Sequence, residues 1–575
     1  MIYPSSPEAR PPISRSVLRL SEHGAATIAH RHGVTRLRNL HAVLEWLTSP
    51  SVARPSSHIW LSPASAGWDL LALPLLRAGY EVRLSRRRGE YLGLWVTRAG
   101  AAFETEHDGI STASGRGWFG GSAADLVSIP PGLSAEEETR ATWEQLDRFD
   151  RLVRERWPGA GLGSSVASTA VSAFKTVLRR PIGLSKAVAA ELIELDAYGG
   201  GHVERYCARG ASFHATAGDA PWETDLSSAY PTAMASLAIP GDFTGYGPAS
   251  EALDDCRITT CLVNVPERRY PPLRFRDGAQ LTYPWGLLLG TFPSSELRSA
   301  AAAGCEIRDV LRVYRFEDRS DEFRAFADSL LALRRDASGP ERDFAKSLGV
   351  QFVGALGSRP KTYRVTTQPE RCSGIRLDRP GLYSERVFEP SDRQILSAAT
   401  TITGGVAGWL GLLLRQYETL GIPAYYIHTD GTGTLGDPTP ALERLFAIGQ
   451  AVPALRIPEG IRRVPGPTLP GAWKVEPLAG VTCWAPNRRI TVSQDGERRV
   501  AAGGISRTLT EAEIEAKMRT DAPSAWTRSG RREGGLWTTP FHVSEIDPML
   551  AMALSELDCE KQGAHVWSQM RTEMR

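Results

Sequence analysis

The 575-residue sequence has few of the features that mark secreted, zinc-stapled or membrane-spanning chains. Its seven cysteines are odd in number and include no C-x-x-C pair, which argues against a disulfide framework and against a zinc site. No stretch approaches ~20 consecutive apolar residues, so neither a membrane span nor a membrane partner is expected. The opening segment MIYPSSPEARPPISRS has no apolar run of a secretory signal. A reducing cytoplasm is the simplest setting for such a chain.

An excess of one charge is also missing, because 67 Lys and Arg residues stand against 65 Asp and Glu residues. The net charge of +2 permits nucleic-acid binding without arguing for it, since local patches matter more than the total. Hydrophobic residues make up 42% of the chain, which is ordinary for a folded protein. The length suggests ~3–5 domains, and no internal repeat is visible.

What the sequence does contain is a regular series of helix and strand patterns. Residues 33–49 place leucine and valine on one helical face, and residues 134–157 predict a long helix with acids early and arginines late. Residues 81–109 alternate as a β-hairpin does. Residues 320–357 predict two helices around a Ser-Gly-Pro break, and residues 388–421 predict one long buried helix. We therefore expect an α/β fold with several domains.

Two carboxylates lie where strands are expected to end. Asp225 ends the strand in TDLSSAYP, and Asp430 follows the strand in YIHTDGTG. Carboxylates on neighbouring strand ends can hold two divalent cations ~3.5–4 Å apart. Mg²⁺ is satisfied by one or two protein carboxylates together with substrate phosphates. The pair therefore predicts phosphoryl or nucleotidyl transfer.

A triphosphate substrate also needs cations, and the predicted helices at 320–357 supply them. Arg342 and Lys346 are four residues apart and share one helical face, and Arg334 lies earlier in the same region. Gly354 would let a base pair lie close to the helix backbone. These residues are candidates for binding a nucleotide.

Three motifs in order carry a resemblance to a known family. The segment Asp225-Leu-Ser-Ser-Ala-Tyr230-Pro resembles motif A of the family B DNA polymerases, D-x-x-S-x-Y-P. The segment from Lys346 to Gly354 resembles motif B, and Tyr426-Ile-His-Thr-Asp430-Gly resembles motif C, Y-x-D-T-D-S. Tyr198-Gly-Gly-Gly looks like the linker between the exonuclease and polymerase halves. The likeness is strongest over 195–435, and the length suits the protein-primed phage or plasmid branch.

This resemblance assigns roles to particular residues. It implies that Asp225, the backbone of Leu226 and Asp430 hold two Mg²⁺ ions, with Mn²⁺ as a substitute. It implies that Tyr230 excludes a 2′-hydroxyl and that Arg334 and Lys346, with Arg342 and Gly354, bind the nucleotide. It places a further set near the template or primer: Tyr198, Gly200, Gly201, His428, Thr429, Arg488 and Arg489.

The sequence departs from the family pattern at several positions. His428 stands where motif C usually has its first acid, which is not the principal metal ligand. Val350 and Gln351 replace the Asn-Ser of motif B, and Val353 replaces a Tyr that lines the nascent base pair. Asn487-Arg488-Arg489 stands in place of a downstream K-x-Y. Positive charge is kept there, but its geometry changes.

The N-terminal part resembles a proofreading exonuclease that has lost part of its site. Asp69 matches the second exonuclease motif, and Asp147 in Trp-Glu-Gln-Leu-Asp matches the third, with Trp143 for Tyr. No Asp precedes Asp69, so the first motif has no counterpart. We expect a degenerate, RNase H-like domain without 3′→5′ proofreading.

The expected fold class is thus α/β and multidomain, a right-hand polymerase preceded by that degenerate exonuclease domain. The expected limits are a flexible lead-in at 1–20, the exonuclease-like domain at 21–190, palm at 191–320 and 361–505, fingers at 321–360, and thumb at 506–575. The second palm segment has room for an insertion. The implied partners are a DNA template and primer, deoxynucleoside triphosphates, and a terminal protein if priming uses one. A bacterial, phage or plasmid setting is implied as well.

Simpler roles stay open for single residues. A lone Asp in a turn is commonly a turn or cap residue, and Tyr230 alone would suit a packed aromatic. Arg342 would equally suit a solvated helix charge. His428 is open between tolerated drift and an altered function.

Two other functions stay open for the whole chain. One is a specialised or untemplated nucleotidyltransferase, consistent with the altered motifs B and C. The other is a catalytically dead scaffold that binds nucleic acid or a partner, against which the two retained acids argue.

Overall fold

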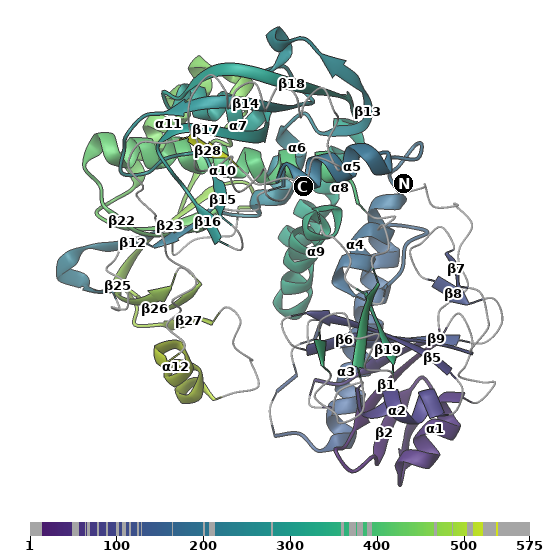
Figure 1. Cartoon of the computed structure of the whole chain (residues 1–575). Coiled ribbons are helices and arrows are strands. Elements are labelled where there is room, and N and C mark those ends of the chain that lie inside the picture. Colours follow the sequence, from purple (N-terminus) through teal and green to yellow (C-terminus); the bar gives the residue numbers. More distant parts are fainter. Residues whose placement is uncertain are drawn as a thin grey trace. The chain divides into compact units, whose positions relative to one another are not determined.

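The computed structural model describes the backbone of most of the chain and divides it into two compact units. Described are residues 14–48, 57–63, 65, 69–77, 80–87, 90–98, 103–105, 111–113, 117–123, 126–127, 129–130, 132–163, 165–198, 202–205, 213–277, 280–357, 362–366, 375–376, 383–387, 394–464, 469–485, 487–502, 510–520 and 536–538. Unit 1 comprises Met1–Ile182 and Asp336–Gln394, and unit 2 comprises Gly183–Arg335 and Ile395–Arg575. Figure 1 labels their elements.

Unit 1 is built on a ten-stranded sheet in the order β20-β21-β19-β5-β6-β9-β4-β1-β2-β3. Strands β1, β2 and β3 form an antiparallel meander, whereas β4 runs parallel to β1 and β9 runs parallel to β4. The bounds are β1 Ser14–Leu20, β2 Ala26–His30, β3 Gly33–Leu37, β4 Ser57–Leu61, β5 Tyr80–Arg87, β6 Glu90–Arg98, β9 Gly117–Ser122, β19 Thr362–Thr366, β20 Ile375–Arg376 and β21 Tyr383–Val387. The strands β7 Phe103–Thr105 and β8 Ser111–Ala113 pair separately.

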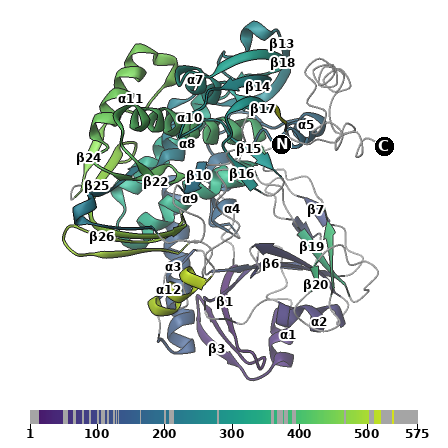
Figure 2. The ribbon, with the colours of Figure 1, turned by 60° about the vertical axis from the view of Figure 1, so that its left-hand side comes forward.

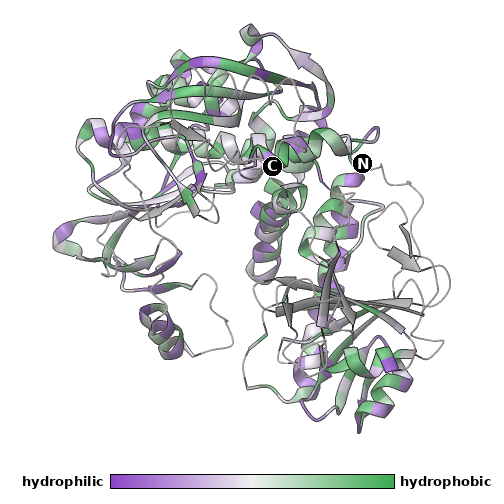
Figure 3. Cartoon of the chain, in the orientation of Figure 1, coloured by the Kyte–Doolittle hydropathy of each residue, from purple (hydrophilic) through white to green (hydrophobic). Residues whose placement is uncertain are grey.

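The helices of unit 1 include α1 Leu40–Thr48, α2 Asp69–Arg77, α3 Ala135–Arg156, α4 Val166–Lys175 and α9 Gly339–Gly357. Helix α9 packs on α3 through Phe344, which stacks on Phe149 with ring centroids 4.3 Å apart. It packs on α4 through Phe352, whose ring lies 4.9 Å from that of Phe174. Figure 3 shows hydrophilic and hydrophobic residues alternating around α9, as expected for a helix with one packed and one solvated side.

Unit 2 contains the sheet that carries both candidate carboxylates. Its main path is β10-β22-β23-β12-β25-β26-β27, and β11 and β24 also pair with β25. The bounds are β10 His202–Arg205, β11 Phe213–Thr216, β12 Pro221–Leu226, β22 Ala424–Thr429, β23 Gly431–Leu435, β24 Ile461–Arg463, β25 Trp473–Ala485, β26 Arg488–Ser493 and β27 Arg498–Ala502. Figure 2 shows β22, β25 and β26 on one side of this unit.

A second sheet of unit 2 has the order β13-β18-β14-β17-β28. Its strands are β13 Pro240–Gly247, β14 Arg257–Val265, β17 Gly286–Pro293, β18 Glu306–Asp318 and β28 Leu536–Thr538, and β15 Phe275–Asp277 pairs with β16 Gln280–Thr282. The helices of the unit are α5 Lys186–Glu194, α6 Ala229–Ser236, α7 Ser294–Ala302, α8 Ser320–Asp336, α10 Leu396–Leu420, α11 Thr439–Ala451 and α12 Glu511–Thr520.

Helix α10 is the core element of unit 2. It lies among α6, α7 and α11 (Figure 1) and is buried over nearly all its length. Within the described residues it is the one helix that is long and apolar enough to span a membrane, but its most apolar 18-residue window is 100% buried inside the protein. That burial is how the core helix of a folded domain behaves.

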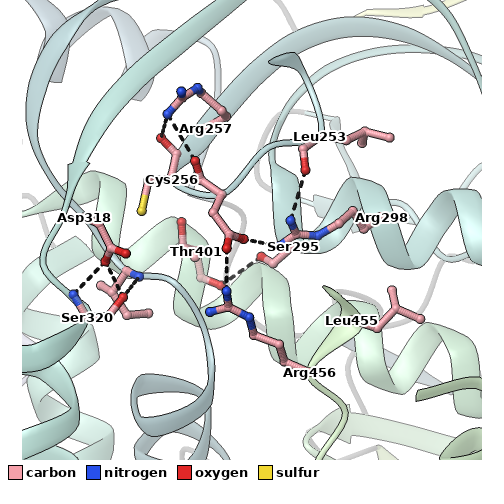
Figure 4. Close-up of polar contacts among 12 residues, drawn as sticks. Leu253, Cys256, Arg257, Ser295, Arg298, Asp318, Ser320, Thr401, Leu455 and Arg456 are labelled. Carbon is pink, nitrogen blue, oxygen red and sulfur yellow. Dashed lines mark hydrogen bonds and ion pairs between the residues drawn. The ribbon is translucent and has the colours of Figure 1, made fainter. Parts of the chain in front are cut away.

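A polar network ties the second sheet to the helices beside it (Figure 4). Asp255, just before β14, accepts a hydrogen bond from Arg298 of α7 at 2.8 Å and another from Arg456, which follows α11. Arg298 also donates to the Leu253 carbonyl at 3.0 Å. Three segments far apart in sequence are thereby held by one carboxylate.

Several expected elements differ from those observed. The predicted helix at 33–49 is in fact strand β3 followed by α1, because residues 33–37 pair with β2 in an antiparallel register. The long helix expected at 388–421 occupies Leu396–Leu420, and residues 388–393 lie outside the described residues. The helix pair at 320–357 and the helix at 134–157 are confirmed.

The division into units also bears on the expected domain limits. Strand β19 pairs with β5 and β21, which joins residues 362–387 to the sheet of unit 1. Residues 361–505 are expected to be the second part of the palm, and this limit stays a prediction like all the others.

Candidate active site

Strand β12 lies between β23 and β25 and holds Asp225 at its end. Asp225 is directly opposite Gly431 of β23 on one side and Lys474 of β25 on the other. Across the β22–β23 hairpin, His428 is opposite Gly431. Residues directly opposite one another in antiparallel strands point to the same face of the sheet. His428, Asp225 and Lys474 therefore form one row on that face, with a glycine between the first two.

The turn after β22 brings Asp430 to the same edge of the sheet. Thr429 has a left-handed backbone with φ of 60°, and the Asp430 amide donates to the His428 carbonyl at 2.7 Å. The Asp430 carbonyl in turn accepts from the Leu226 amide at 2.9 Å, one residue after Asp225. The two candidate metal ligands thus lie in adjacent strand ends joined by a backbone hydrogen bond.

Gly431 is required for this close approach. A Cβ at Gly431 would lie 2.9 Å from the Thr224 carbonyl oxygen and 3.1 Å from Oδ1 of Asp225. A side chain here would force the β12–β23 pair apart or displace the carboxylate. The D-G step of motif C therefore has a packing reason in this protein.

Four side chains gather around the loop between β12 and α6. Arg334, at the end of α8, donates through Nη1 to the hydroxyl of Ser228, which has a left-handed backbone with φ of 61°. Tyr230, in the first turn of α6, is largely buried, and burial together with the nearby Tyr198 and Asp430 raises the pKa of its phenol. The structure thus brings Tyr198, Tyr230, Arg334 and Asp430 together.

His428 is half-buried beside Arg489. Burial, with a smaller contribution from the Arg489 charge, lowers the pKa of the imidazole to about 4. The ring is neutral near pH 7, so the site carries no extra positive charge from this position.

Arg489 is held inside unit 2 by contacts that the sequence did not indicate. Its Nε donates to Oε1 of Glu223 at 2.8 Å, and its Cζ lies 4.4 Å from the centre of the Tyr426 ring. The Tyr426 hydroxyl donates to the same Glu223 oxygen at 2.7 Å. Burial raises the pKa of Glu223, but Arg489 and Tyr426 outweigh it and hold the net pKa below the ordinary value. Arg488, its neighbour, is half-buried.

Lys474 and Glu476 form a second ion pair, which no sequence motif marks. Lys474 makes an ion pair with Glu476, which is 2% exposed and also accepts two hydrogen bonds from Arg499 at 2.6 and 2.8 Å. The alternation of β25 shows that Lys474 and Glu476 share a face, but only the strand register shows that Asp225 lies opposite Lys474.

The remaining nucleotide-binding candidates lie in unit 1, on α9. Arg342 is half-buried and Lys346 is exposed, and both belong to a row spaced by four residues that continues through Val350 and Gly354. Val350 is 46% exposed, and a Cβ at Gly354 would meet nothing within 4 Å. Val350 and Gly354 on this side of α9 therefore leave space beside the helix, and the nucleotide-binding role of the row stays a prediction.

The exonuclease candidates occupy helices of unit 1. Asp69 is the first residue of α2, and Asp147 pairs with Arg151 on the surface of α3 at 3.3 Å.

Gly200 and Gly201, which the resemblance sets near the template or primer, lie outside the described residues. The roles of all these residues stay predictions.

The donor set at Asp225 and Asp430 fits divalent cations that share their ligands with a substrate. Two carboxylates at adjacent strand ends, with the backbone beside them, suit hard oxygen-seeking ions. Within the described residues no three His, Cys, Asp or Glu side chains cluster as a metal cage.

Comparison with known proteins identifies the fold. No protein-family model and no curated protein matches the sequence. The structure of phi29 DNA polymerase complexed with primer-template DNA and incoming nucleotide substrates matches with a TM-score of 0.59 at 12% identity, over 88% of this chain and 95% of that chain. An orthorhombic crystal form of phi29 DNA polymerase gives 0.60, and its complex with single-stranded DNA gives 0.57, at the same identity and coverage.

The likeness defines the class of fold to which the chain belongs. The chain has a mixed α/β fold of the family B DNA polymerase type, similar to that of phi29 DNA polymerase. The expectation of a protein-primed, family B-like fold is thereby confirmed for the fold. At 12% identity the activity does not follow from the likeness.

Proposed function

We propose that the protein is a DNA polymerase that adds deoxynucleotides to a primer by two-metal nucleotidyl transfer. The observation that carries the proposal is the register that joins Asp225 to Gly431, with the Leu226 amide bonded to the Asp430 carbonyl at 2.9 Å. Two acids far apart in sequence are brought to one strand edge in a polymerase-type fold. A pair of unrelated turn residues would have no reason to meet there.

The residues present have complementary tasks in such a reaction. Asp225, the Leu226 carbonyl and Asp430 would hold two Mg²⁺ ions, with Mn²⁺ as a substitute, and these ions supply charge neutralisation for an in-line displacement at phosphorus. Arg334 lies at the loop that follows Asp225 and would bind the triphosphate. Lys346 is a second candidate for that role, on the strength of its match to motif B. Neutral His428 adds no charge that would oppose cations at this edge.

Tyr230 is the residue that we propose as the sugar gate. It lies near Asp430 and Tyr198 and is half-buried, and its ring would present a flat wall to a nucleotide sugar. A wall against the C2′ position would exclude a ribonucleotide by contact with its 2′-hydroxyl. The attacking group is a primer 3′-hydroxyl, or a protein hydroxyl if a terminal protein serves as primer.

Proofreading is absent from this proposal. The N-terminal sequence offers Asp69 and Asp147 but no acid pair of the first exonuclease motif. Wild-type protein should therefore leave a labelled single strand intact, and Asp69→Ala should change nothing in that assay. Loss of a measurable 3′→5′ degradation in Asp69→Ala would contradict the proposal. We also propose that the protein acts in the cytoplasm.

Primer extension on defined templates tests the activity. Wild-type protein should give long templated products with Mg²⁺ or Mn²⁺, whereas Asp225→Ala and Asp430→Ala should lower incorporation by at least about 10³-fold. A matched control is Asp437→Ala, two residues beyond β23, which should keep activity. No incorporation by wild-type protein with either metal would favour a nucleic-acid-binding scaffold.

A specialised or untemplated nucleotidyltransferase is the second candidate. The observation that favours it is that residues near motif C differ from the family pattern. Arg489 donates a hydrogen bond to Glu223, and His428 stands in place of an acid. Single additions, or products independent of the template sequence, would favour this activity over templated synthesis.

A further inference from the structure

We propose that Glu223, Arg489 and Tyr426 form a buried clamp that sets the positions of the strands bearing Asp225 and Asp430. Arg489 is then a positioning residue for the metal-binding carboxylates rather than a contact to DNA. We call these three side chains the Glu223 clamp. The inference deepens the proposed function and rests on it.

The clamp joins three strands through one carboxylate. Glu223 lies two residues before Asp225 on β12 and so points to the same face of the sheet. Tyr426 lies on β22, whose end leads into the turn of Asp430, and Arg489 lies on β26. The Tyr426 hydroxyl at 2.7 Å and Arg489 Nε at 2.8 Å both donate to Oε1 of Glu223. A shift of any of these strands along its axis would break a hydrogen bond.

A glycine in strand β23, Gly433, allows the Tyr426 side chain to reach Glu223. Strand β23 separates β22 from β12, and Gly433 lies opposite both Tyr426 and Glu223. A Cβ at Gly433 would lie 2.4 Å from Tyr426 Cε1 and 2.4 Å from Tyr425 Cζ. The Tyr426 ring therefore crosses over Gly433 to bond Glu223. Gly431 and Gly433 are two residues apart on β23. Because neither has a side chain, space is left on this sheet face beside Asp225 in one row and beside Glu223 in the other.

Burial makes the clamp strong and costly to break. The side chains of Arg489 and Glu223 are 19% and 12% exposed, so each charge has exchanged most of its water for the other. Removing one partner from such a pair leaves a buried charge without compensation. The guanidinium also lies over the Tyr426 ring at 4.4 Å from its centre, a cation–π contact that fixes its plane.

The clamp also determines which negative charges near motif C are left to attract cations. His428 brings no negative charge, and the Glu223 carboxylate on the same face is matched by Arg489. The charges left to attract cations at the strand edge are then those of Asp225 and Asp430. The contacts with Glu223 and Tyr426 fix the direction in which the Arg489 guanidinium points. Residues that support metal ligands from behind are commonly held by protein contacts in the same way.

Mn²⁺ binding to the full-length protein tests the clamp without relying on turnover. Free Mn²⁺ is measured by electron paramagnetic resonance during titration of the metal-free protein, with Asp225→Asn marking the binding that belongs to the site. Glu223→Gln and Arg489→Met should each weaken that binding by about tenfold. The double variant should be hardly weaker than the worse single variant, because the two residues act as one unit.

The control is Arg498→Lys on the neighbouring strand β27, whose exposed guanidinium pairs with Glu515 at 2.7 Å. It should bind Mn²⁺ like the wild type. Tyr426→Phe removes only the hydroxyl, keeps the packed ring, and should weaken Mn²⁺ binding by a smaller factor of about three. This variant keeps the test informative if Arg489→Met fails to fold.

DNA binding provides the opposing outcome. In the clamp, Arg489→Met leaves the affinity for primer-template DNA and its salt dependence unchanged. Unchanged Mn²⁺ binding, with weaker DNA binding and a salt slope lower by about one, would overturn the clamp and make Arg489 a phosphate contact. Mn²⁺ binding that depends on Asp225 and the clamp, in a protein that incorporates no nucleotide, would instead refute only the proposed function.

Discussion

At the scale of single residues, two glycines and one histidine shape the candidate site as much as the two acids do. Gly431 and Gly433 are the residues of β23 that lie opposite Asp225 and Glu223. Each lacks the side chain that would otherwise separate the polar groups of β12 from those of β22. Strand β23 has glycine at its first and third positions, which leaves room on this sheet face for side chains of both neighbouring strands.

Substitution of Gly431 should inactivate the site without unfolding the protein. Gly431→Ala places a Cβ 3.1 Å from Asp225 Oδ1, so the carboxylate has to move. A displacement of about 1 Å can cost about 10²-fold in rate, and a loss of that order is expected in primer extension. Gly480→Ala in β25, where the nearest atom would be 3.5 Å away, is the matched control and should keep full activity. Equal activity of the two variants would argue against this reading of the turn.

His428 should give the metal-free protein a pH-dependent stability. Its folded-state pKa is about 4 against the ordinary 6.5, so between these values the unfolded chain binds a proton that the folded chain does not. Stability is therefore full above about pH 6.5 and is lost as pH falls toward 4, by up to ~3 kcal/mol. The urea midpoint in EDTA should fall more steeply between pH 7 and 4.5 for wild-type protein than for His428→Gln. Parallel curves would show that His428 is not buried as described.

At the scale of elements, α10 shows how glycine can serve packing inside a helix. Gly404, Gly405, Gly408 and Gly411 have neighbours so close that a Cβ would lie 2.3–3.0 Å from them, and those neighbours include Pro293 and Ser299 at α7. The sequence TITGGVAGWLGLLL reads as an ordinary apolar helix. Its small residues are the reason that α7 can lie directly against it.

Filling one of these contacts should destabilise unit 2. In Gly408→Ala the new Cβ would lie 2.7 Å from Ser299 Oγ, so α7 has to shift. A cost of about 1–3 kcal/mol is expected, measured as a lower urea midpoint. Thr419→Ala, on the exposed end of the same helix, should change stability by less than about 0.5 kcal/mol. A Gly408→Ala protein as stable as the control would mean that α7 and α10 are not in this contact.

The elements also show where periodicity is a sound guide and where it is not. The helices at 135–156 and 339–357 follow from sustained patterns, and the structure confirms them. Residues 33–37 fit a helical face as well as a strand, and pairing with β2 decides for the strand. A five-residue segment has too few positions to separate a period of 2 from a period of 3.6.

At the scale of the whole molecule, the chain crosses between its two units three times. Residues 336–394 return to the unit formed by the N-terminal part, and β19 pairs with β5 from nearly 280 positions earlier. No local pattern carries this information, because a strand signal does not specify its partner.

Thiol reactivity should report the cores that this arrangement creates. Cys256, Cys261, Cys305 and Cys483 are buried, and burial raises the pKa of the first three to about 12, 12 and 11. In native protein at pH 8 these thiols should react with iodoacetamide at least about tenfold more slowly than in urea. Peptide-resolved mass spectrometry separates them from the other cysteines. Rapid labelling of Cys261 in native protein would contradict the second sheet as described.

The sequence by itself determined the parts of this protein that depend on residue type and short spacing. It gave the two acids with their flanking motifs, the helices that hold Arg334 and Lys346, and through motif order the fold. Those features are local, and each requires only that a strand ends or a helix begins where the pattern indicates.

Only the tertiary structure decided which of these residues share a surface. The motifs predict a place near DNA for Arg489, which stays a prediction, and the structure adds its hydrogen bond to Glu223, a residue that no motif marks. Lys474 lies opposite Asp225 because β25 pairs with β12 in that register. Register and strand order come from burial and hydrogen bonding summed over long-range pairs, and a one-residue slip would have sent either side chain to the opposite face.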